Sequence, residues 1–219
     1  MGVAIRRAGE GDREALTRLL DEGFYHDPVS TWIFPDPERR RRHHGTMMGA
    51  FLDAALADGY VDMTEDGSGV ALWFSMPGPD AAGAADAAVD GGAQGGHGED
   101  AGRAAARALR EAVDPDNERV EQISLILDAN HPADRPHEYL MLIAVSPDQR
   151  GRGVGAALIN STLERCDREG RYAYLEASSV RSSRLYERLG FHLDSRTVDL
   201  PDGPRMLPMW REPRPRTAG

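Results

Sequence analysis

The sequence contains no lysine, so all 26 of its basic residues are arginines. It has one cysteine, Cys166, and therefore cannot form an internal disulfide. No apolar run approaches the roughly 20 residues that a membrane-spanning helix needs, and the first residues, MGVAIRRAGEGDREAL, lack the apolar stretch of a secretory signal. Together these absences predict a reduced, cytoplasmic setting and no membrane partner.

The net charge is acidic, at −10 over 219 residues. Nucleic-acid-binding domains are usually basic, so we expect no nucleic-acid partner. Hydrophobic residues make up 40% of the chain, which is enough for an ordinary core. We expect a single domain over residues 1–219 that carries a low-complexity insert, rich in Gly and Ala, at about 77–102. For the wider segment 77–116, the composition fits a lid and a passive linker equally well.

Apolar periodicity and turn residues outline the elements of the chain. Asp12 is expected to cap the first helix, and Gly59 and Gly190 to close two later ones. Three prolines predict a loop over 25–37. The predicted helices cover residues 11–24, 38–59, 103–113, 117–130, 154–169 and 182–190. The predicted strands cover residues 3–8, 60–66, 69–76, 138–145, 172–178, 191–200 and 205–210.

The stretch VSPDQRGRGVGAAL links a predicted strand to a predicted helix through a glycine-rich loop. The first N–H groups of a helix lack partners within the helix and lie at the positive end of its dipole. Gly151 and Gly153 permit close approach of a ligand to the backbone, and Arg150 and Arg152 add donors for phosphate oxygens. This loop therefore predicts a ligand that carries phosphate groups.

Two other kinds of phosphate-binding site compete with this interpretation of the loop. A P-loop requires a lysine, which the chain lacks. A dinucleotide site would use Gly151, Gly153 and Ala156 as GxGxxA, with Glu176 as the ribose-binding acid. However, residues 146–150 separate the predicted strand from the first glycine, and the chain before the motif does not alternate strand and helix. A dinucleotide enzyme would bind NAD(H) and not coenzyme A.

Residues 150–155, RGRGVG, resemble the acyl-CoA signature R/Q-x-x-G-x-G/A of the GNAT N-acetyltransferases. About 30 residues later, SSRLYERLGF is similar to the second signature of that family. The segments GFYHDP, HPADRPHEYLMLIAV and LPDGPRM extend the resemblance toward the puromycin N-acetyltransferase branch and its actinobacterial relatives. The resemblance implies a mixed α/β (α+β) fold, with a central, twisted, mostly antiparallel sheet, two splayed parallel strands and flanking helices.

The resemblance also implies acetyl-CoA as the co-substrate, bound in the splay. Its pantetheine arm would pair with the backbone of Ile143 and Val145, and its pyrophosphate would lie on the N–H groups of residues 151–156. In many members an asparagine precedes the second-signature helix, where this chain has Ser179. The residues predicted to bind acetyl-CoA are Ile143, Ala144, Val145, Arg150, Gly151, Arg152, Gly153, Val154, Gly155, Ala156, Ser179, Ser182 and Tyr186.

Tyr186 is the predicted general acid, because a tyrosine hydroxyl near the sulfur can protonate the leaving thiolate. The alternative is an aromatic ring that only packs. A general base is also needed to deprotonate an ammonium substrate. Glu176 is the predicted base, and Glu138, Tyr139 and an ordered water remain alternatives.

The predicted acceptor site mixes an acid with aromatic groups, a combination suited to a cationic amine. It consists of Tyr25, His26, Asp27, Trp32 and Tyr139. The histidines show no metal-ligand spacing, so no metal is expected. The run ERRRRHH, residues 38–44, is expected to form a solvated helix face, and Cys166 to pack as an inert residue.

These observations predict an acyltransferase that moves the acetyl group of acetyl-CoA to a primary amine by direct attack on the thioester. A small molecule, such as an antibiotic or a related metabolite, is the expected acceptor, and the enzyme is expected as a monomer or homodimer. One alternative is a protein or peptide N-acetyltransferase, with an open acidic groove. The other is an acyl-CoA-binding module without turnover, which would be indifferent to Tyr186→Phe.

Overall fold

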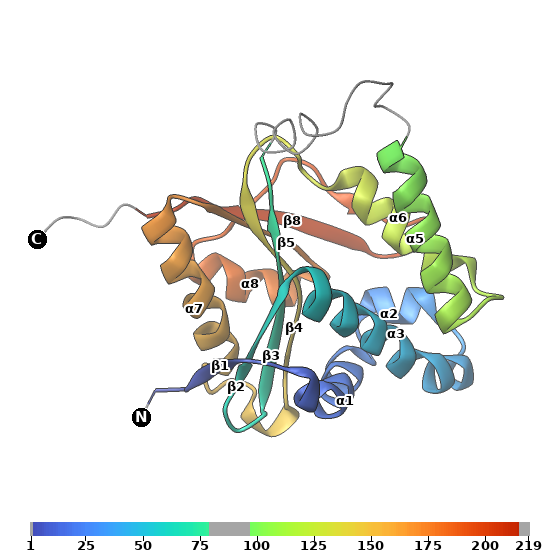
Figure 1. The fold of residues 1–219 in the computed structure, drawn as a ribbon, viewed down its shortest axis with the longest axis horizontal. Helices are drawn as coiled ribbons and strands as arrows, with labels where there is room; N and C mark the ends of the chain where they lie inside the picture. Colours follow the sequence, from blue (N-terminus) through green and yellow to red (C-terminus); the bar gives the residue numbers. More distant parts are fainter. Residues whose placement is uncertain (1, 79–96, 215–219) are drawn as a thin grey trace, which may run out of the picture.

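The computed structural model describes residues 2–78 and 97–214 of the chain. Eight strands form one mixed sheet in the order β1-β2-β3-β4-β5-β8-β6, and β7 pairs with the far part of β8 (Figure 1). The strands are β1 (Ile5–Arg7), β2 (Tyr60–Thr64), β3 (Gly69–Met76), β4 (His137–Val145), β5 (Tyr172–Ala177), β6 (His192–Leu193), β7 (Val198–Asp199) and β8 (Arg205–Arg211).

Helices cover both faces of this sheet (Figure 1). The α-helices are α1 (Arg13–Phe24), α2 (Pro28–Ile33), α3 (Pro37–Asp58), α5 (His97–Val113), α6 (Glu118–Asn130), α7 (Val154–Glu169) and α8 (Val180–Arg188). The short 3₁₀ helices are η1 (Glu10–Asp12) and η2 (Pro147–Gln149). No α-helix in the described ranges is long and apolar enough to cross a membrane.

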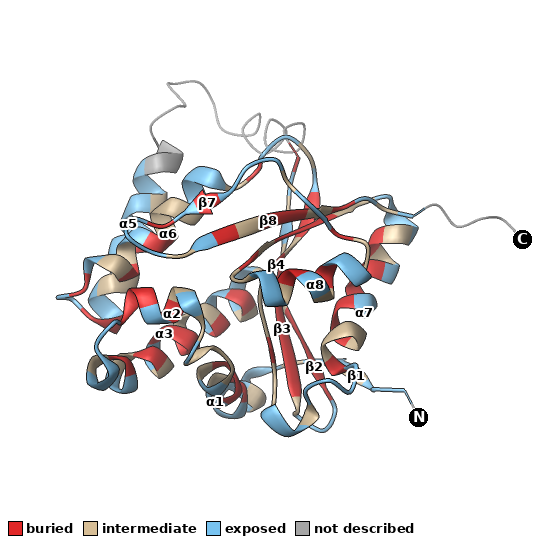
Figure 2. Ribbon diagram, turned by 180° about the vertical axis from the view of Figure 1, so that it is seen from behind, coloured by how far each residue is buried: buried red, intermediate tan, exposed pale blue. Residues whose placement is uncertain are grey.

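Alternation along β3 divides the core into two clusters. Val70 and Leu72 pack with residues of α1, α2, α3 and α6, whereas Ala71 and Trp73 pack with α7, β5 and Phe191 on the other face. Successive side chains of a strand point to opposite faces, so one strand serves both clusters. Figure 2 shows the consequence as a nearly continuous buried colour along β3.

All but one of the sheet's neighbouring strands run antiparallel, and the exception is the β4–β5 pair. This pair runs parallel, as the family resemblance implied, with β4 and β5 side by side at the centre of the sheet. The predicted mixed sheet with flanking helices is therefore confirmed. The remaining differences from the predictions are local.

Two of these differences lie at the starts of helices. The predicted loop 25–37 contains α2, which starts at Pro28 with the Asp27 side chain accepting a hydrogen bond from the Val29 N–H, 2.9 Å away. Proline is well suited to a first helical position, because its missing N–H would have no partner there. Asp12 does not cap α1 with its side chain; its carboxylate instead accepts from the Gly9 N–H at 3.0 Å and closes η1.

Gly59 ends α3 as predicted, but not through the left-handed conformation, since its φ is −127°. A Cβ at this position would lie 2.2 Å from the Trp73 carbonyl oxygen, so the close approach of β3 requires glycine. Gly190 follows α8 with φ +91°, as predicted.

The last two predicted boundaries also shift. The predicted strand 191–200 is broken into β6 and β7, with Asp194 between them accepting from the Arg196 N–H at 3.0 Å. The helix predicted over 103–113 starts at His97, which lies inside the predicted insert 77–102. The rest of that insert, residues 79–96, lies outside the described residues, as does part of the segment 77–116.

The basic run 38–44 was predicted to be solvated, and this prediction was wrong for two of its members. Arg40 and His44 are buried, with His44 fully inaccessible. Arg40 donates to the Phe34 carbonyl at 2.9 Å, and His44 contacts polar partners on α1 and α2. The run occupies more than one face of α3, so every third or fourth member turns toward the core.

Candidate functional site

The two central strands separate partway along their length. β4 and β5 are in register only from His137 opposite Tyr172 to Tyr139 opposite Tyr174, and no pairs follow. On the edge of β4 that faces β3, the consecutive residues Leu72 and Trp73 pair with Leu142 and Leu140. Met141 is left without a partner and forms a bulge. A bulge bends its strand and re-aims the side chains beside it. The sheet is thus split beyond Tyr139.

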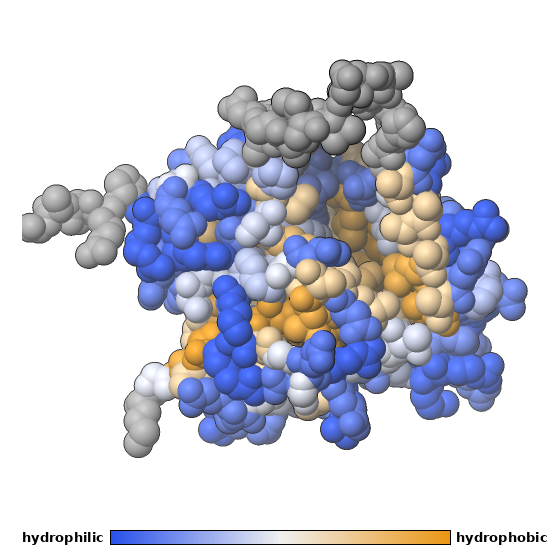
Figure 3. Space-filling model, viewed as in Figure 1, coloured by the Kyte–Doolittle hydropathy of each residue, from blue (hydrophilic) through white to orange (hydrophobic). Residues whose placement is uncertain are grey.

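A cavity of about 100 Å³ lies at this split. Its wall combines segments of α1, α2, α3, α6, β4, β5 and α8, and most of its side chains are apolar. The space-filling view shows hydrophobic colours near the middle of the molecule, with hydrophilic colours over much of the surrounding surface (Figure 3). The polar side chains of the wall are Asp27, Ser30, Tyr139, Glu176, Ser178 and Tyr186.

Asp27 sits at the N-terminus of α2 and faces this cavity. Its carboxylate accepts from the Val29 N–H and also from the Ser178 hydroxyl, at 2.5 Å. Burial raises the pKa of Asp27, while these donors and the nearby His44 act to lower it. The Asp27 carboxylate is therefore held by hydrogen bonds from two sides of the cavity, from α2 and from the residue that follows β5.

Glu176 contributes a second carboxylate from the end region of β5. Its Oε1 atom is buried and has no hydrogen-bond partner among the described residues. Burial raises the pKa of Glu176, and the neighbouring Tyr174 and Tyr139 hydroxyls oppose that rise. A carboxylate with a raised pKa and a free oxygen suits proton uptake or the binding of a cation.

Tyr186 lies on α8 and is 8% exposed. Its ring packs edge-on against Phe191, with the centroids 6.0 Å apart. Burial, and then the negative charge of Asp27, raise the pKa of Tyr186. The hydroxyl therefore keeps its proton at neutral pH, as a general acid must.

A second cavity, of about 420 Å³, lies over the glycine-rich loop. Gly151 and Gly153 have φ of +77° and +85°, a region that L-residues rarely adopt. The Ala157 N–H donates to the Gly153 carbonyl, so the preceding N–H groups at the start of α7 have no helical partner. This cavity is lined by Val145, Gln149, Arg150, Gly151, Gly153, Val154, Gly155, Ala156, Leu185, Arg188 and Leu189.

Most of the predicted acetyl-CoA residues thus fall on one of the two cavities, and Ile143 and Tyr186 lie on the first. Ala144 instead faces α1, where Gly23 makes room for it. The Arg150 Nε donates to the Val145 carbonyl at 3.2 Å. Ser179 and Ser182 form a capping box at the start of α8, with the Ser179 hydroxyl accepting from the Ser182 N–H at 3.2 Å.

The predicted acceptor site is brought together only in part. Asp27 and Tyr139 line the first cavity, whereas Tyr25, His26 and Trp32 are not among its lining residues. The Trp32 Nε1 donates to the Pro201 carbonyl at 2.8 Å, which holds the turn between β7 and β8. The Tyr25 hydroxyl donates to the Pro37 carbonyl at 3.3 Å, and His26 is exposed.

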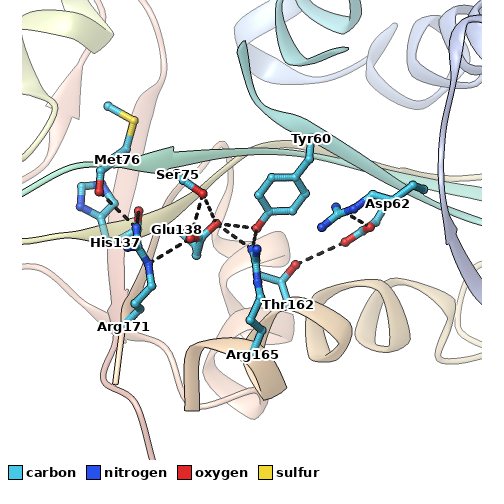
Figure 4. A network of polar contacts seen from close by, with 10 residues as sticks. Tyr60, Asp62, Ser75, Met76, His137, Glu138, Thr162, Arg165 and Arg171 are labelled. Carbon is cyan, nitrogen blue, oxygen red and sulfur yellow. Dashed lines mark hydrogen bonds and ion pairs between the residues drawn. The ribbon is translucent and has the colours of Figure 1, made fainter. Parts of the chain in front are cut away.

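Glu138, the alternative base, belongs to a separate polar network (Figure 4). It accepts hydrogen bonds from the hydroxyls of Tyr60, at 2.5 Å, and Ser75, at 3.0 Å, and pairs with Arg165 and Arg171 at 2.9 and 3.0 Å. Because neighbouring residues of a strand face opposite sides, Glu138 points to α7 while Tyr139 points to the cavity. The position of Glu138 is that of a structural ion pair.

Sequence reasoning did not identify Ser30, His44 and Ser178 as site residues. Ser178 bonds to Asp27, and Ser30 contacts the ring of His44. No periodic spacing joins these residues, although the DPxS pattern at 27–30 is a helix-start signal that would have revealed α2. Within residues 2–78 and 97–214, no group of three or more potential ligands could hold a metal ion.

The comparisons with known proteins agree with this geometry. Residues 99–191 match the model of the acetyltransferase (GNAT) family, and this segment contains β4, the glycine-rich loop, α7, β5 and α8. An uncharacterized N-acetyltransferase of Schizosaccharomyces pombe is 38% identical over 53 residues, or 24% of this chain. The match spans 22% of that relative's length.

Two solved structures extend the likeness to nearly the whole chain. A structure titled histone acetyltransferase HPA2 and related acetyltransferase, from Corynebacterium glutamicum, is 25% identical, with a TM-score of 0.65 over 100% of both chains. The polyamine N-acetyltransferase of Drosophila melanogaster is 18% identical, with a TM-score of 0.63 over 95% of this chain and 98% of its own. The predicted GNAT fold is confirmed.

Proposed function

We propose that this chain, an acyltransferase with the GNAT family's acetyltransferase segment and fold, moves an acetyl group from acetyl-CoA to a primary amine of a small molecule. The observation that carries the proposal is the split between β4 and β5. The first cavity lies at this split and holds two carboxylates and a protonated tyrosine, and the second lies over the glycine-rich loop that follows β4.

The loop cavity supplies what a pyrophosphate needs. The N–H groups at the start of α7 point toward it, and no acidic residue occupies the first turn of that helix. Arg150 and Arg152 add charge near the loop, although Arg152 is not among the residues lining the cavity. A pantetheine arm that pairs with the Val145 carbonyl would take the position of the Arg150 Nε and free that side chain for phosphate.

The first cavity suits the amine end of a small acceptor. A volume of about 100 Å³ accommodates only a few heavy atoms, and the wall is mainly apolar around Asp27 and Glu176. Such a pocket suits one ammonium group on a short apolar stem. The Drosophila neighbour is a polyamine N-acetyltransferase that catalyses the formation of N-acetylagmatine, so its acceptor is a small amine. An antibiotic acceptor, puromycin included, is the finer form of the same proposal.

In the mechanism, the amine attacks the thioester carbonyl directly. Glu176 takes a proton from the ammonium, which leaves a lone pair on nitrogen. A backbone N–H of β4 near Val145 stabilises the developing oxyanion. The C–S bond then breaks, Tyr186 gives its proton to the departing sulfur, and the nitrogen loses its second proton to become the neutral amide. The lone cysteine and the use of acetyl-CoA suit a reaction in the cytoplasm.

The experiment that tests this function is a thiol-release assay with acetyl-CoA across a panel of small amines, with the N-acetyl product identified by mass spectrometry. We expect amine-dependent release of coenzyme A, and a product heavier than the amine by one acetyl group. If acetyl-CoA binds but no amine, peptide or protein is acetylated, the chain is a binding module and the proposal fails. Acetylation of peptides alone would favour the protein-modifying alternative.

A further inference from the structure

Three side chains from three helices form a hydrogen-bonded chain beside the first cavity. The Asp21 Oδ1 on α1 lies 2.5 Å from the Nδ1 of His44 on α3. The Nε2 of the same ring lies 2.9 Å from the hydroxyl of Ser30 on α2. Ser30 lines the cavity and His44 is fully buried, whereas the Asp21 side chain is 38% exposed. The chain therefore leads from the cavity wall toward solvent.

The hydrogen-bond pattern fixes how this chain is protonated. A carboxylate can only accept, so Asp21 selects the tautomer of His44 with the proton on Nδ1. The Nε2 atom is then free to accept the proton of the Ser30 hydroxyl. Burial lowers the pKa of His44, and Asp21 opposes that shift, so the ring is neutral at neutral pH. This is the state in which it can take up a proton.

The acceptor nitrogen loses two protons in each turnover, and the two have different destinations. An ammonium carries three protons on nitrogen, and the amide product carries one. One proton must leave before attack and another as the C–N bond forms and the C–S bond breaks. The sulfur receives one proton from Tyr186, and the proton held by Glu176, whose Oε1 atom is buried, restores that hydroxyl. The other proton of the nitrogen therefore has to reach solvent by a separate route.

We propose that Ser30, His44 and Asp21 form a relay that accepts the second proton of the acceptor nitrogen and passes it out of the cavity. The nitrogen gives a proton to the Ser30 Oγ while the Ser30 proton moves to His44 Nε2. The resulting imidazolium passes its Nδ1 proton to the Asp21 carboxylate, which releases it to water at its exposed side, and the ring returns to its starting tautomer before the next turnover. Ser30 touches the substrate in this scheme, and His44 and Asp21 are positioning residues. The inference rests on the proposed acetyltransferase function.

The charges around His44 favour this role. Asp21 faces the ring from α1 and Asp27 from α2, and both stabilise the imidazolium, while Arg40 on α3 opposes it. The ring of Tyr25 packs edge-on at a centroid distance of 5.8 Å. The surroundings thus hold two carboxylates against one guanidinium, which allows His44 to carry a positive charge briefly.

The kinetic test compares Ser30→Ala and His44→Gln with His43→Gln. His43 is the neighbouring histidine on α3, and its ring contacts the Val113 carbonyl instead of the cavity wall. We expect kcat to fall about 10²-fold in the two relay variants, in line with the usual contribution of acid–base groups, with acetyl-CoA affinity unchanged. The acid limb of the kcat–pH profile should also change in both, and the control should match the wild type in rate and profile.

The relay is wrong if the wild type acetylates an amine and both relay variants retain its kcat and pH profile. Loss of folding in His44→Gln would leave Ser30→Ala to decide, because that change removes only one oxygen. If no amine is acetylated by the wild type, the proposed function fails first. A separate readout, ¹⁵N NMR of the His44 imidazole at pH 7, should show a protonated Nδ1 and a bare Nε2. A proton on Nε2 would overturn the relay whatever the activity.

Discussion

The Asp27 carboxylate accepts a 2.5 Å hydrogen bond from the hydroxyl of Ser178, across 151 positions of the chain. This contact ties the start of α2 to the residue that follows β5 and closes the cavity between them. One residue thus caps a helix, joins two walls and places a negative charge where the amine is proposed to bind.

Asp27→Asn separates these roles. Asparagine is as good a helix cap as aspartate, so the fold should persist while the charge is lost. We expect the KM of the amine acceptor to rise about tenfold, equivalent to about 1.4 kcal/mol, with little change in acetyl-CoA affinity. Asp36→Asn is the matched control, because Asp36 caps α3 on the surface. An equal KM in both variants would show that Asp27 does not contact the acceptor.

Tyr186→Phe tests the general acid. Removal of the hydroxyl should lower kcat about 10²-fold with acetyl-CoA affinity retained, whereas Tyr172→Phe, at the opposite end of β5, should behave as wild type. Burial and Asp27 raise the pKa of Tyr186 above its ordinary 10, so the acid form persists as pH rises. The kcat of the wild type should therefore show no loss from this group below about pH 10. A Tyr186→Phe enzyme with full kcat would refute the assignment.

Gly153→Ala tests the loop. A non-glycine residue with positive φ costs about 1–2 kcal/mol, and the strain falls on the N–H groups proposed to hold the pyrophosphate. Gly67→Ala provides the same strain in the β2–β3 turn, where φ is +73° and a Cβ would also meet open space. Both variants should lose similar stability in urea titrations, but only Gly153→Ala should lose acetyl-CoA affinity, by tenfold or more. Equal affinities would move the phosphate site elsewhere.

Replacing Glu138 or Glu176, which lie on the adjacent strands β4 and β5, by glutamine should have opposite effects on stability and on kcat. Glu138→Gln breaks a buried network with two arginines, and we expect the free energy of unfolding to fall by about 3 kcal/mol with kcat per folded enzyme retained. Glu176→Gln removes a buried carboxylate that has an unpartnered oxygen, so stability should hold while kcat falls. Urea titration measures the stability of both variants, and steady-state kinetics measures their kcat. A Glu138→Gln variant that is stable but inactive would show that Glu138, and not Glu176, is the catalytic residue.

His131 links stability to pH. It stacks on His137, with the two Nε2 atoms 3.1 Å apart, and burial lowers the pKa of His131 to about 4. In the unfolded chain this histidine binds a proton near pH 6.5, whereas in the folded chain it does so only near pH 4. Its contribution to the free energy of unfolding is therefore complete above about pH 6.5 and is lost as the pH falls to about 4. The loss should reach about 2 kcal/mol for this partly exposed group.

Urea titrations of wild type and His131→Gln at pH 7.5 and 4.5 measure this contribution. The wild type should lose more stability between the two pH values than the variant does. Equal losses would assign acid sensitivity to other groups.

Local patterns in the sequence predicted much of the fold. Buried strands over 138–145 and 172–178 and the glycine-rich loop are each encoded within short segments, and the structure has all three. Glu176 and Tyr186, the predicted general base and general acid, both line the first cavity. Asp27 was predicted to bind the acceptor, and it lines the same cavity. Its role as the N-cap of α2 was not predicted.

Contacts between distant helices could not be predicted in this way. Ser30, His44 and Asp21 meet because α1, α2 and α3 pack together, and each residue alone is unremarkable in its local pattern. Trp32 was predicted to belong to the acceptor site. Its indole instead lies against the β7–β8 turn, where the Nε1 donates to the Pro201 carbonyl. Residue type indicated a binding wall, but the direction in which the helix turns the side chain decides what it contacts.

The most direct test of the account is a calorimetric titration of the purified protein with acetyl-CoA, with NADH as the comparison ligand and Gly153→Ala as the comparison protein. We expect saturable binding of acetyl-CoA to the wild type, weaker binding to the variant, and no binding of NADH. Binding of NADH, or of neither ligand, would contradict the assignment of the split sheet and its glycine-rich loop as an acetyl-CoA site.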